Sequence, residues 1–331
     1  MTGKGRRLAI AVVQGGPTSE AEVSRASAAS VAKALAAAGH RPVRLELNGH
    51  LAESLRTGGF ELVFPVAHGA VGEDGSLQGL LEVLELPYVG SDVLASALAM
   101  NKRVAKVLFA DAGLPIAKGL AAKRGARSAA AEAERAIAEL GSKVVVKPCS
   151  NGSAIGVARF DAGGAAQEIA AAIDAAWAVD ETALVEALAT GREVTCGVLD
   201  LHHAEAQALP PTEIRAPNDA FYTYQARYAP GRSEHLCPAP LGDALVARVR
   251  ELAVMAHRAL GCRDLSRVDF VVGEQPTLLE VNTMPGFTDT SLYPEAAGVA
   301  GIPMPELCDR LATAAFERGP TRRNAPLPLP R

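Results

Sequence analysis

Apolar and polar positions follow strand-like and then helix-like spacing in turn over the first hundred residues. Leu8–Val13 is a continuous apolar run that ends in a glycine-rich turn, which is typical of a buried strand. An alanine-rich stretch then predicts a helix to about Ala38, with Gly39 as its C-terminal cap. Pro42–Leu47 and Leu62–Val66 are further strand-like runs. Because strand and helix signals alternate, this region predicts a parallel sheet.

The rest of the chain predicts two further units. The second begins near Asn101 and contains a helical segment, Ser128–Leu140, followed by the strand-like run Val144–Lys147. The third opens near residues 184–186 and includes a long amphipathic helix, Asp243–Leu260. We therefore predict domains at residues 1–96, 97–185 and 186–318, with a Pro/Arg-rich disordered tail at 319–331.

Two β-rich runs near the end of the chain flank a turn-type cluster and predict a hairpin. If Val272 pairs with Thr277 across a four-residue loop, four polar side chains share one face of it. These are Arg267, Asp269, Glu280 and Asn282, with Asp269 opposite Glu280 and Arg267 opposite Asn282. Like charges directly opposite each other destabilise a ladder, so we expect a cation between the two carboxylates. Mg²⁺ suits two carboxylates and an amide, and it commonly carries nucleotide phosphates. The alternative is an edge hairpin with a solvated acidic face.

Residues 210–240 form a long polar, proline-rich stretch without clear periodicity. It lies inside the third predicted unit, where loops of this length are usually functional lids or disordered. Most of the few aromatic residues of the chain gather here, and they include Phe221, Tyr222, Tyr224 and Tyr228. We therefore interpret the stretch as a lid that packs onto a ligand.

Three glycine-containing loops follow predicted strands and are candidate ligand-binding loops. Lys147–Gly156 combines a lysine with small residues whose backbone N–H groups can face an anion, although a plain hairpin turn is the alternative. Gln14–Ser24 opens the first helix, where Glu22 could simply complement the helix dipole. His68–Gly75 follows the third strand at the same edge of the sheet, and His68 could be purely structural.

Composition narrows the class of protein. The chain has 331 residues, of which 49% are hydrophobic and 21% charged, which is ordinary for a globular protein. A net charge of −4 gives no basic footprint for nucleic acid, and no apolar stretch is long enough to span a membrane. Five scattered cysteines without a CxxC spacing argue against a disulfide framework and a structural zinc site. We therefore expect a reduced, cytoplasmic protein without nucleic-acid or membrane partners.

From about residue 8 to 318, the chain resembles the D-alanine–D-alanine ligases of the ATP-grasp superfamily. Six segments carry this resemblance in the order of the family: GGPTSEAEVS (15–24), HGAVGEDGSLQGLLEVLELPYVGS (68–91), ASALAMNK (95–102), KPCSNGSAIG (147–156), FYTYQARY (221–228) and RVDF…LLEVNTMPGFT (267–288). The resemblance implies an α/β, three-domain ATP-grasp fold, in which an N-terminal parallel-sheet domain precedes two domains that hold ATP between their sheets.

The resemblance also implies an activity. Two D-alanines would be joined with the use of ATP, through an acyl phosphate, to supply peptidoglycan precursors. The alternative is an ATP-grasp ligase that joins D-alanine or a related acid to a different acceptor, such as D-serine, D-lactate or a biosynthetic amine. The family is commonly dimeric, so we expect a homodimer.

Roles for the nucleotide and metal ligands follow from the same resemblance. Lys102 and Lys147 would hold the α- and β-phosphates, while Glu186 and Glu193 would bind the adenine amine and the ribose. Two Mg²⁺ ions, for which Mn²⁺ could substitute, would be held by the residues that the hairpin register singles out: Asp269, Glu280 and Asn282.

For the first D-alanine, the resemblance assigns Glu22 to the amine and His68 to the surroundings of the carboxylate. Ser153 and Tyr228 would form a hydrogen-bonded link with Glu22 that closes the lid.

For the second D-alanine, Ser291 and Leu292 would take the carboxylate. Arg267 and the backbone N–H of Gly286 would stabilise the acyl phosphate and the oxyanion.

Three positions depart from the family pattern. Ala154 replaces the second serine of the phosphate loop, and Ala187 replaces a lysine near the adenine. Arg227 replaces a lysine in the lid; it keeps the charge expected near the nucleotide, but its planar fork is not equivalent. These changes leave the implied reaction class intact and bear on rate and nucleotide affinity.

Overall fold

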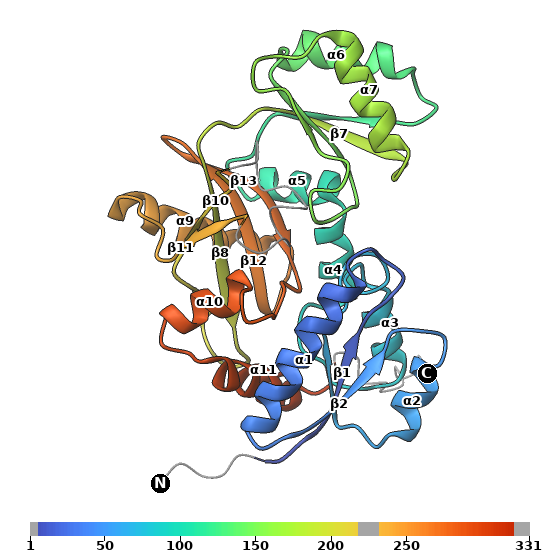
Figure 1. Ribbon diagram of the computed structural model, residues 1–331, viewed down its shortest axis with the longest axis vertical. Helices are drawn as coiled ribbons and strands as arrows, with labels where there is room; N and C mark the ends of the chain where they lie inside the picture. Colours follow the sequence, from blue (N-terminus) through green and yellow to red (C-terminus); the bar gives the residue numbers. More distant parts are fainter. Residues whose placement is uncertain (1–5, 218–231, 321–331) are drawn as a thin grey trace, which may run out of the picture.

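The computed structural model describes residues 6–217 and 232–320, whose strands form three sheets (Figure 1). Four of the predicted lid and tail features fall outside these residues. They are the aromatic cluster at positions 221–228, Arg227, Tyr228 and the tail beyond residue 320.

The N-terminal sheet is parallel, as the alternating pattern predicts. Its strands are β1 (Ala9–Gln14), β2 (Arg41–Glu46) and β3 (Leu62–Pro65), and its helices are α1 (Ala21–Ala37), α2 (Leu51–Thr57), α3 (Ser76–Val83) and, from the end of the chain, α11 (Met304–Arg318). The strand order is β2-β1-β3. Ile10 and Val12 pack with α1 and α11, while Ala11 and Val13 pack with α2 and α3. Helices therefore cover both faces, which explains the continuous apolar run of the first strand.

The central sheet is antiparallel and has helices on one face only. It consists of β4 (Gly119–Lys123), β5 (Val144–Pro148), β6 (Ala158–Arg159) and β7 (Thr182–Ala187), with helices α6 (Ala129–Leu140) and α7 (Ala166–Trp177). The strand order is β4-β7-β5-β6. Val144 and Val146 pack against α6 and α7, on the upper side of the sheet in Figure 1. Alternate residues such as Val145 and Lys147 therefore face away from the helices.

The C-terminal sheet has six antiparallel strands, of which β8 is the centre. The strands are β8 (Arg192–Asp200), β9 (Gln207–Ala208), β10 (Thr212–Arg215), β11 (Glu234–Leu236), β12 (Asp264–Val272) and β13 (Pro276–Asn282), and the helices are α9 (Asp243–Ala259) and α10 (Leu292–Val299). The order is β11-β10-β8-β12-β13, with β9 paired to β8. Helix α9 contributes Val249, Leu252 and Ala256 to a core with Cys196 and Phe270. The opposite face of β12 and β13 carries the four polar side chains that the sequence predicts for the hairpin.

Two short helices join the N-terminal and central sheets: α4 (Val93–Met100) and α5 (Lys102–Asp111). Asn101 lies between them and caps α5 by accepting a hydrogen bond from Val104 N. The predicted boundary after residue 96 therefore falls inside α4. The predicted boundary after residue 185 falls inside β7, which pairs with β4 and β5 as far as Ala187.

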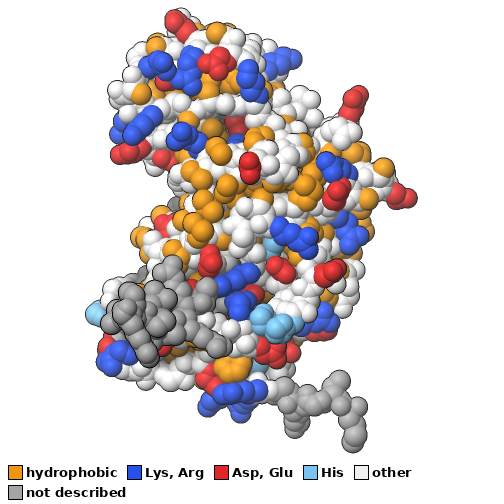
Figure 2. All heavy atoms as spheres, turned by 180° about the vertical axis from the view of Figure 1, so that it is seen from behind, with side chains coloured by type: hydrophobic (Ala, Val, Ile, Leu, Met, Phe, Trp, Pro, Cys, Tyr) orange, Lys and Arg blue, Asp and Glu red, His pale blue; other side chains and the backbone are white. Residues whose placement is uncertain are grey.

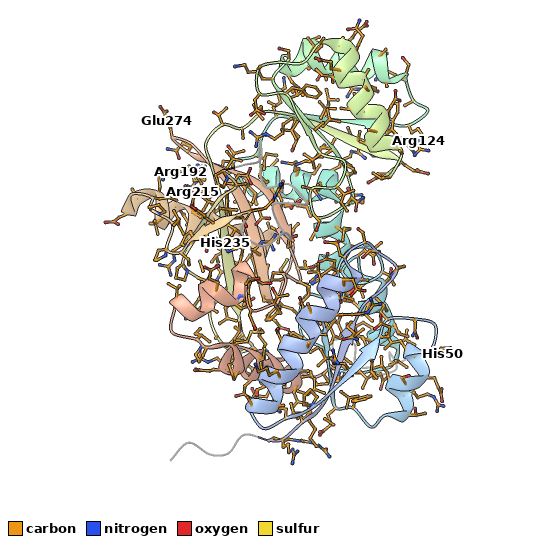
Figure 3. The ribbon with its side chains drawn as sticks, in the orientation of Figure 1. His50, Arg124, Arg192, Arg215, His235 and Glu274 are labelled. Carbon is orange, nitrogen blue, oxygen red and sulfur yellow. The ribbon has the colours of Figure 1, made fainter. Side chains whose placement is uncertain are left out.

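The long polar segment at 210–240 contains two strands that the sequence pattern does not indicate. β10 and β11 pair with each other, and β10 also pairs with β8. Arg192 and Arg215 lie beside each other at this side of the sheet (Figure 3) and both bind buried Glu213, at 3.3 and 2.7 Å. Among residues 6–217 and 232–320, no helix has the length and apolar character needed to cross a membrane.

A buried ion pair connects β12 of the C-terminal sheet with α11. Asp264 of β12 is fully buried, and Arg318 of α11 binds both of its carboxylate oxygens. Gly90 N also donates to Asp264 at 2.7 Å, and Arg318 donates to Tyr88 O at 2.9 Å. The N-terminal unit is thereby attached to the C-terminal sheet.

Arg318→Met should lower the free energy of unfolding by about 3–5 kcal/mol, because it leaves the buried Asp264 carboxylate without its cation. Urea unfolding followed by circular dichroism measures the change. Arg310→Met is the matched control, because Arg310 lies on the same helix in a half-exposed pair with Glu306. The control should change stability by about 0.5 kcal/mol or less. Equal effects of the two variants would contradict this account of the ion pair.

Candidate active site

The hairpin of β12 and β13 brings the four predicted polar residues together. Asp269 lies opposite Glu280 and Arg267 opposite Asn282, as predicted. The predicted pairing nearer the turn is wrong by one residue, because Val272 pairs with Pro276 and not with Thr277. The register shifts between Asp269 and Phe270, where a β-bulge adds one residue to β13 and restores the predicted pairing at the site. The turn therefore has three residues, with Glu274 projecting at its tip (Figure 3).

The bulge also changes which side chains face the cleft. Leu278 and Val281 belong to the core beneath the sheet. Leu279 and Glu280, between them, both line a pocket on the other face. Strict alternation would place two neighbouring residues on opposite faces. The extra residue thus gives the pocket an apolar side chain and a carboxylate from adjacent positions.

Each carboxylate of the hairpin is held by a cation from the protein. Arg267 donates to Asp269 from Nε to Oδ1 at 2.9 Å and from Nη2 to Oδ2 at 2.8 Å. Thr195 Oγ1 and Asn282 Nδ2 also donate to Asp269, at 2.6 and 3.2 Å. Lys102 Nζ lies 3.1 Å from Glu280 Oε2. The expected cationic partner is therefore present as two side chains, one for each carboxylate.

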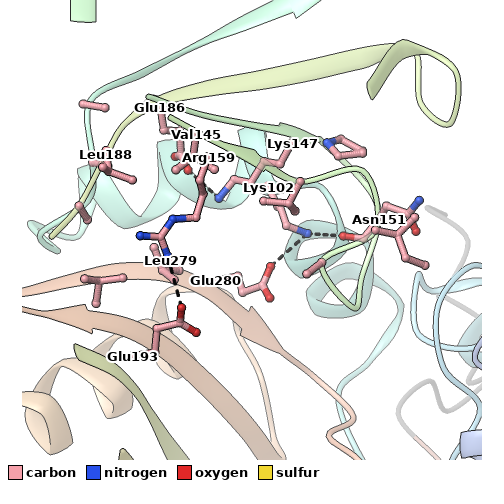
Figure 4. A pocket seen from close by; sticks show the side chains of 18 of the residues that line it. Lys102, Val145, Lys147, Asn151, Arg159, Glu186, Leu188, Glu193, Leu279 and Glu280 are labelled. Atoms are coloured by element: carbon pink, nitrogen blue, oxygen red, sulfur yellow. Dashed lines mark hydrogen bonds and ion pairs between the residues drawn. The ribbon is translucent and has the colours of Figure 1, made fainter. Parts of the chain in front are cut away.

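A pocket lies between the central and C-terminal sheets (Figure 4). Its lining combines apolar and charged side chains. The apolar lining includes Val145, Val157, Leu188, Val271 and Leu279; the charged lining is Lys102, Lys147, Arg159, Glu186, Glu193 and Glu280. All four nucleotide-binding residues predicted within the described part of the chain, Lys102, Lys147, Glu186 and Glu193, are therefore brought together.

Glu186 is the centre of a buried charge cluster in this pocket. Its Oε2 lies 2.6 Å from Lys147 Nζ, and its Oε1 lies 2.6 Å from Lys106 Nζ. Burial alone would raise the pKa of the Glu186 carboxyl, but the two lysines outweigh it and hold that pKa below its usual value. Burial lowers the pKa of Lys106. For Lys147 burial acts in the same direction, but Glu186 and Glu280 outweigh it and the pKa is raised.

The loop after β5 lines the end of the pocket where Lys102 lies. Lys102 Nζ donates to Asn151 O at 2.6 Å, which attaches the loop to α5. Ser153 and Ala154 have positive φ values of 50° and 57°, so consecutive backbone groups turn in one direction. Such a turn makes a concave row of N–H groups that suits an anion. Ala154 thus supplies the loop with backbone geometry although it lacks a hydroxyl.

A second pocket, of about 1330 Å³, adjoins the first and is lined from all three units. Its polar lining includes Glu20, His68, Glu73, Ser153, Arg267, Glu280, Asn282 and Ser291. Ser153 Oγ donates to Glu20 Oε1, which joins the loop of the central sheet to the start of α1. Glu280 lines both pockets. The two pockets therefore meet at the hairpin carboxylates.

Buried His68 and half-buried Glu73 give this second pocket unusual electrostatics. Burial lowers the pKa of His68, with Glu20 opposing this shift and Arg267 adding to it, so the imidazole is neutral near pH 7. Its Nε2 has no hydrogen-bond partner among residues 6–217 and 232–320. Burial, together with nearby Glu20, raises the pKa of Glu73 to about 8. Both side chains therefore favour their uncharged forms inside the pocket.

The predicted second-substrate residues lie at the start of α10. Ser291 precedes the helix, and its Oγ accepts a hydrogen bond from Thr288 N at 2.9 Å. Leu292 is the first helical residue and is buried. Gly286 approaches this turn closely, because a Cβ there would lie 2.9 Å from Ser291 Oγ. Gly286 and Ser291 line the pocket together with Arg267, as the resemblance implies.

Comparisons with known proteins match this architecture over nearly the whole chain. The family models for the D-ala D-ala ligase N-terminus and C-terminus match residues 46–91 and 108–313. The D-alanine--D-alanine ligase of Desulforamulus reducens is 42% identical over 94% of this chain and 99% of its own length. That of Moorella thermoacetica is 42% identical over 94% of this chain and 100% of its own length.

The chain belongs to the D-alanine–D-alanine ligase family.

Solved structures of the family confirm the expected ATP-grasp fold. The Bacillus anthracis D-alanine--D-alanine ligase complexed with ATP has a TM-score of 0.79 and 27% identity, over 94% of this chain and 98% of that one. The ligase from Coxiella burnetii has a TM-score of 0.77 and 27% identity, over 94% of this chain and 96% of that one. The prediction of an α/β fold with an N-terminal parallel sheet is therefore correct.

One contact expected from the family resemblance is wrong. Ser153 was predicted to bond Glu22, but it bonds Glu20. Glu20 lies just before the first residue of α1 and is buried, whereas the Glu22 side chain is 85% exposed and pairs with Arg25. Glu22 also borders the second pocket, but the carboxylate that accepts the hydrogen bond from Ser153 is that of Glu20. Tyr228, the third member of the predicted link, lies outside the described residues.

Sequence reasoning missed three other polar residues of this ligase-family site: Lys106, Glu73 and Thr195. Lys106 follows Lys102 by four residues on α5, and this helical spacing is the signal that could have found it. Glu73 belongs to the glycine-rich loop that was singled out only for His68. Thr195 belongs to no motif in the sequence. Its role appears only in the structure, through its hydrogen bond to Asp269.

The raised pKa of Glu73 predicts a pH-dependent stability difference. The folded state keeps a proton up to a pKa of about 8, whereas the ordinary value is 4.5, so the free energy of unfolding of the wild type should fall as pH rises between these values. Glu73→Gln removes this titration. Its melting temperature relative to the wild type should therefore rise between pH 5 and pH 8, as measured by differential scanning fluorimetry. Glu22→Gln, the exposed control, should follow the wild type; a Glu73→Gln curve that also ran parallel to the wild type would refute the assignment.

Proposed function

We propose that this chain joins two D-alanines to form D-alanyl-D-alanine, using ATP and an acyl-phosphate intermediate, for peptidoglycan precursor synthesis. The observation that carries this proposal is the position of Glu280, which lines both the first pocket and the second pocket. A terminal phosphate bound near Glu280 would meet an acceptor bound in the second pocket. The D-alanine--D-alanine ligases to which the chain is similar support the choice of substrates.

In the first pocket, the nucleotide has a suitable partner for each of its parts. Lys102 and Lys147 carry the positive charges for the α- and β-phosphates, and the loop that contains Ser153 offers backbone N–H groups. Glu186, which lies beside Lys147, and Glu193 are acceptors for the adenine amine and the ribose hydroxyls. Arg227 lies outside the described residues, and its contribution beside the nucleotide stays a prediction.

The hairpin residues fit the two Mg²⁺ ions, or Mn²⁺ in their place, that the family resemblance implies. Asp269, Glu280 and Asn282 supply two carboxylates and an amide on one face, which is the oxygen-rich set that Mg²⁺ prefers. The described residues contain no cluster of three His, Cys, Asp or Glu side chains for a metal, so phosphate oxygens would complete the coordination. When bound, the ions would neutralise charge on the phosphates and polarise the transferred group. Lys102 and Arg267, which now neutralise the carboxylates, would then be released towards the phosphates.

In the second pocket, the structure revises one expected role. We propose that Glu20, in place of Glu22, orients the amine of the first D-alanine, because it is buried and bonded to Ser153. A neutral His68 near Arg267 is suited to donate to the first carboxylate without adding a second permanent charge.

The second D-alanine would bind beside the turn before α10. Ser291 and the helical N-terminus at Leu292 offer donors for its carboxylate. Arg267 and the Gly286 N–H would stabilise negative charge on the carbonyl oxygen of the intermediate.

The chemistry then requires little beyond positioning and charge stabilisation. The carboxylate of the first D-alanine attacks the γ-phosphate, and ADP leaves. The amine of the second D-alanine attacks the acyl carbonyl, and inorganic phosphate leaves. Water would destroy the acyl phosphate, so residues that close the pocket serve the reaction by exclusion. The predicted lid, including Tyr228, would have this purpose.

Compartment and assembly belong to the same proposal. Five free cysteines and the use of ATP support the reducing cytoplasm as the site of action. The rear face carries a band of apolar side chains across its middle (Figure 2). Leu94 of α4 and Val107 of α5 are 66% and 64% exposed, which supports a homodimer that covers these apolar side chains.

An acceptor panel tests the proposed activity directly. The purified protein should release ADP from Mg-ATP only when D-alanine is present, and mass spectrometry should identify D-alanyl-D-alanine. D-serine, D-lactate and L-alanine should each be offered as the second substrate together with D-alanine. Each should give less mixed product than the amount of D-alanyl-D-alanine formed from D-alanine alone. ATP turnover that ignores D-alanine, or a preferred product with another acceptor, would overturn the proposal.

Glu20→Gln and Glu22→Gln form a matched pair for the substrate site. Glu20→Gln removes the buried charge proposed to hold the ammonium group, so KM for the first D-alanine should rise roughly 10- to 100-fold. Glu22→Gln changes an exposed side chain and should alter KM by less than about twofold. Steady-state kinetics at saturating ATP distinguish the two. A larger effect at Glu22 would restore the original assignment and reject Glu20.

A further inference from the structure

A row of side chains crosses the central sheet and faces the nucleotide pocket. Glu186 of β7 is paired with Val145 of β5, and Val145 is paired with Arg159 of β6. All three line the pocket. Because side chains at paired positions lie on the same face, they form one continuous wall. Arg159 stands at the end of this wall, on the edge strand of the sheet.

The opposite wall belongs to the C-terminal sheet and ends in a carboxylate. Glu193 of β8 is paired with Val271 of β12, and both line the same pocket. Arg159 Nη1 lies 3.5 Å from Glu193 Oε1, so the ends of the two walls meet (Figure 4). Towards the phosphate end, Lys102 and Glu280 make a second ion pair at 3.1 Å. The pocket thus lies between two ion pairs, and Arg159–Glu193 marks the nucleoside end.

Arg159 is shared between two carboxylates of different units. Its Nη2 lies 2.6 Å from Asp161 Oδ1, which belongs to the same unit and does not line the pocket. The contact with Glu193 is longer, and both side chains are partly exposed, at 22% and 27%. Ion pairs of this kind are readily rearranged. Asp161 therefore anchors the guanidinium, and the longer pair with Glu193 is the one that a ligand can rearrange.

The chemistry of this end of the pocket suits a ribose diol. A carboxylate only accepts hydrogen bonds, and the 2′- and 3′-hydroxyls of ribose are two adjacent donors. A carboxylate accepts both only when its plane is turned towards the diol. A neighbouring guanidinium favours one orientation of that plane because it attracts one carboxylate oxygen.

We propose that Arg159 is a specificity-determining positioning residue: it spans the two sheets and orients Glu193 to accept both ribose hydroxyls. This inference rests on the proposed function only in taking a nucleoside triphosphate as the ligand of this pocket. Arg159 does not line the second pocket, where D-alanine is proposed to bind. Its loss should therefore affect the selection of the nucleotide.

The test compares ADP with 2′-deoxy-ADP by isothermal titration calorimetry, in the presence of Mg²⁺ and without D-alanine. The wild type should prefer ADP about tenfold, as expected for one hydrogen bond to a charged group. In Arg159→Met this preference for ADP should be smaller than in the wild type by a factor of about five, mainly because ADP binds more weakly. Arg159→Lys keeps the charge with a single donor group and should give an intermediate preference.

Asp161→Asn is the matched control, because it removes the other carboxylate partner of Arg159 without altering the pocket lining. Its preference for ADP should equal or exceed that of the wild type. Melting temperatures establish that each variant folds, and kinetics of Asp161→Asn at saturating ATP should show kcat and KM for D-alanine within about twofold of the wild type.

Three results would overturn the proposal. An unchanged ADP preference in Arg159→Met would show that Arg159 does not orient Glu193 for the ribose. Tighter ADP binding in this variant would show that Arg159 competes with the ribose for Glu193. Equal weakening of ADP and 2′-deoxy-ADP would reduce the effect to packing or net charge. Each of these is distinct from failure of the proposed function, which would appear as a wild type that releases no ADP in response to D-alanine.

Discussion

The site depends on two carboxylates that face each other across neighbouring strands. Asp269 and Glu280 lie directly opposite, an arrangement that costs free energy unless cations neutralise it. In this structure Arg267 and Lys102 perform that task, with Thr195 and Asn282 satisfying the remaining acceptors of Asp269. The same two cations are suited to phosphate. A metal–nucleotide complex bound as proposed would therefore take their place at the carboxylates.

The proposed replacement of these two protein cations by a metal–nucleotide complex would require the three units to meet at one place. Lys102 comes from the helix that follows the N-terminal unit, the hairpin comes from the C-terminal sheet, and Ser153 comes from the loop of the central sheet. Glu20 reaches the same place from the N-terminal unit. Weak ion pairs such as Arg159–Glu193 cross between units near the ligand, whereas the buried Asp264–Arg318 pair holds them together farther away. A buried pair thus holds the units together away from the site, while a more exposed pair crosses between units beside the ligand.

The sequence predicted the parts of this site that depend on local periodicity. Strand alternation was enough to place Arg267, Asp269, Glu280 and Asn282 on one face. The bulge at Leu279 could not be foreseen, because β-rich residues fill the run and no glycine marks the extra position. The predicted and observed registers agree at the site only because this bulge offsets a turn that is one residue shorter than predicted.

Features set by tertiary contacts were less accessible from sequence. Whether Glu20 or Glu22 accepts the hydrogen bond from Ser153 depends on where α1 begins, and helix ends are poorly defined by pattern alone. The predicted boundary after residue 185 divides β7, although the pairing of this strand places it in the central sheet. Lys106 is buried only because Glu186 lies beside it, and nothing in its own helix requires a partner from β7.

Binding of Mn²⁺ to the nucleotide-loaded protein, followed by the loss of the free-ion signal in electron paramagnetic resonance, tests the central claim most directly. With ADP and inorganic phosphate present, the wild type should take up Mn²⁺ that Glu280→Gln and Asp269→Asn fail to bind at the same concentration. Uptake that is identical in the wild type and both variants would show that these opposed carboxylates are not where the metal-bound nucleotide is held.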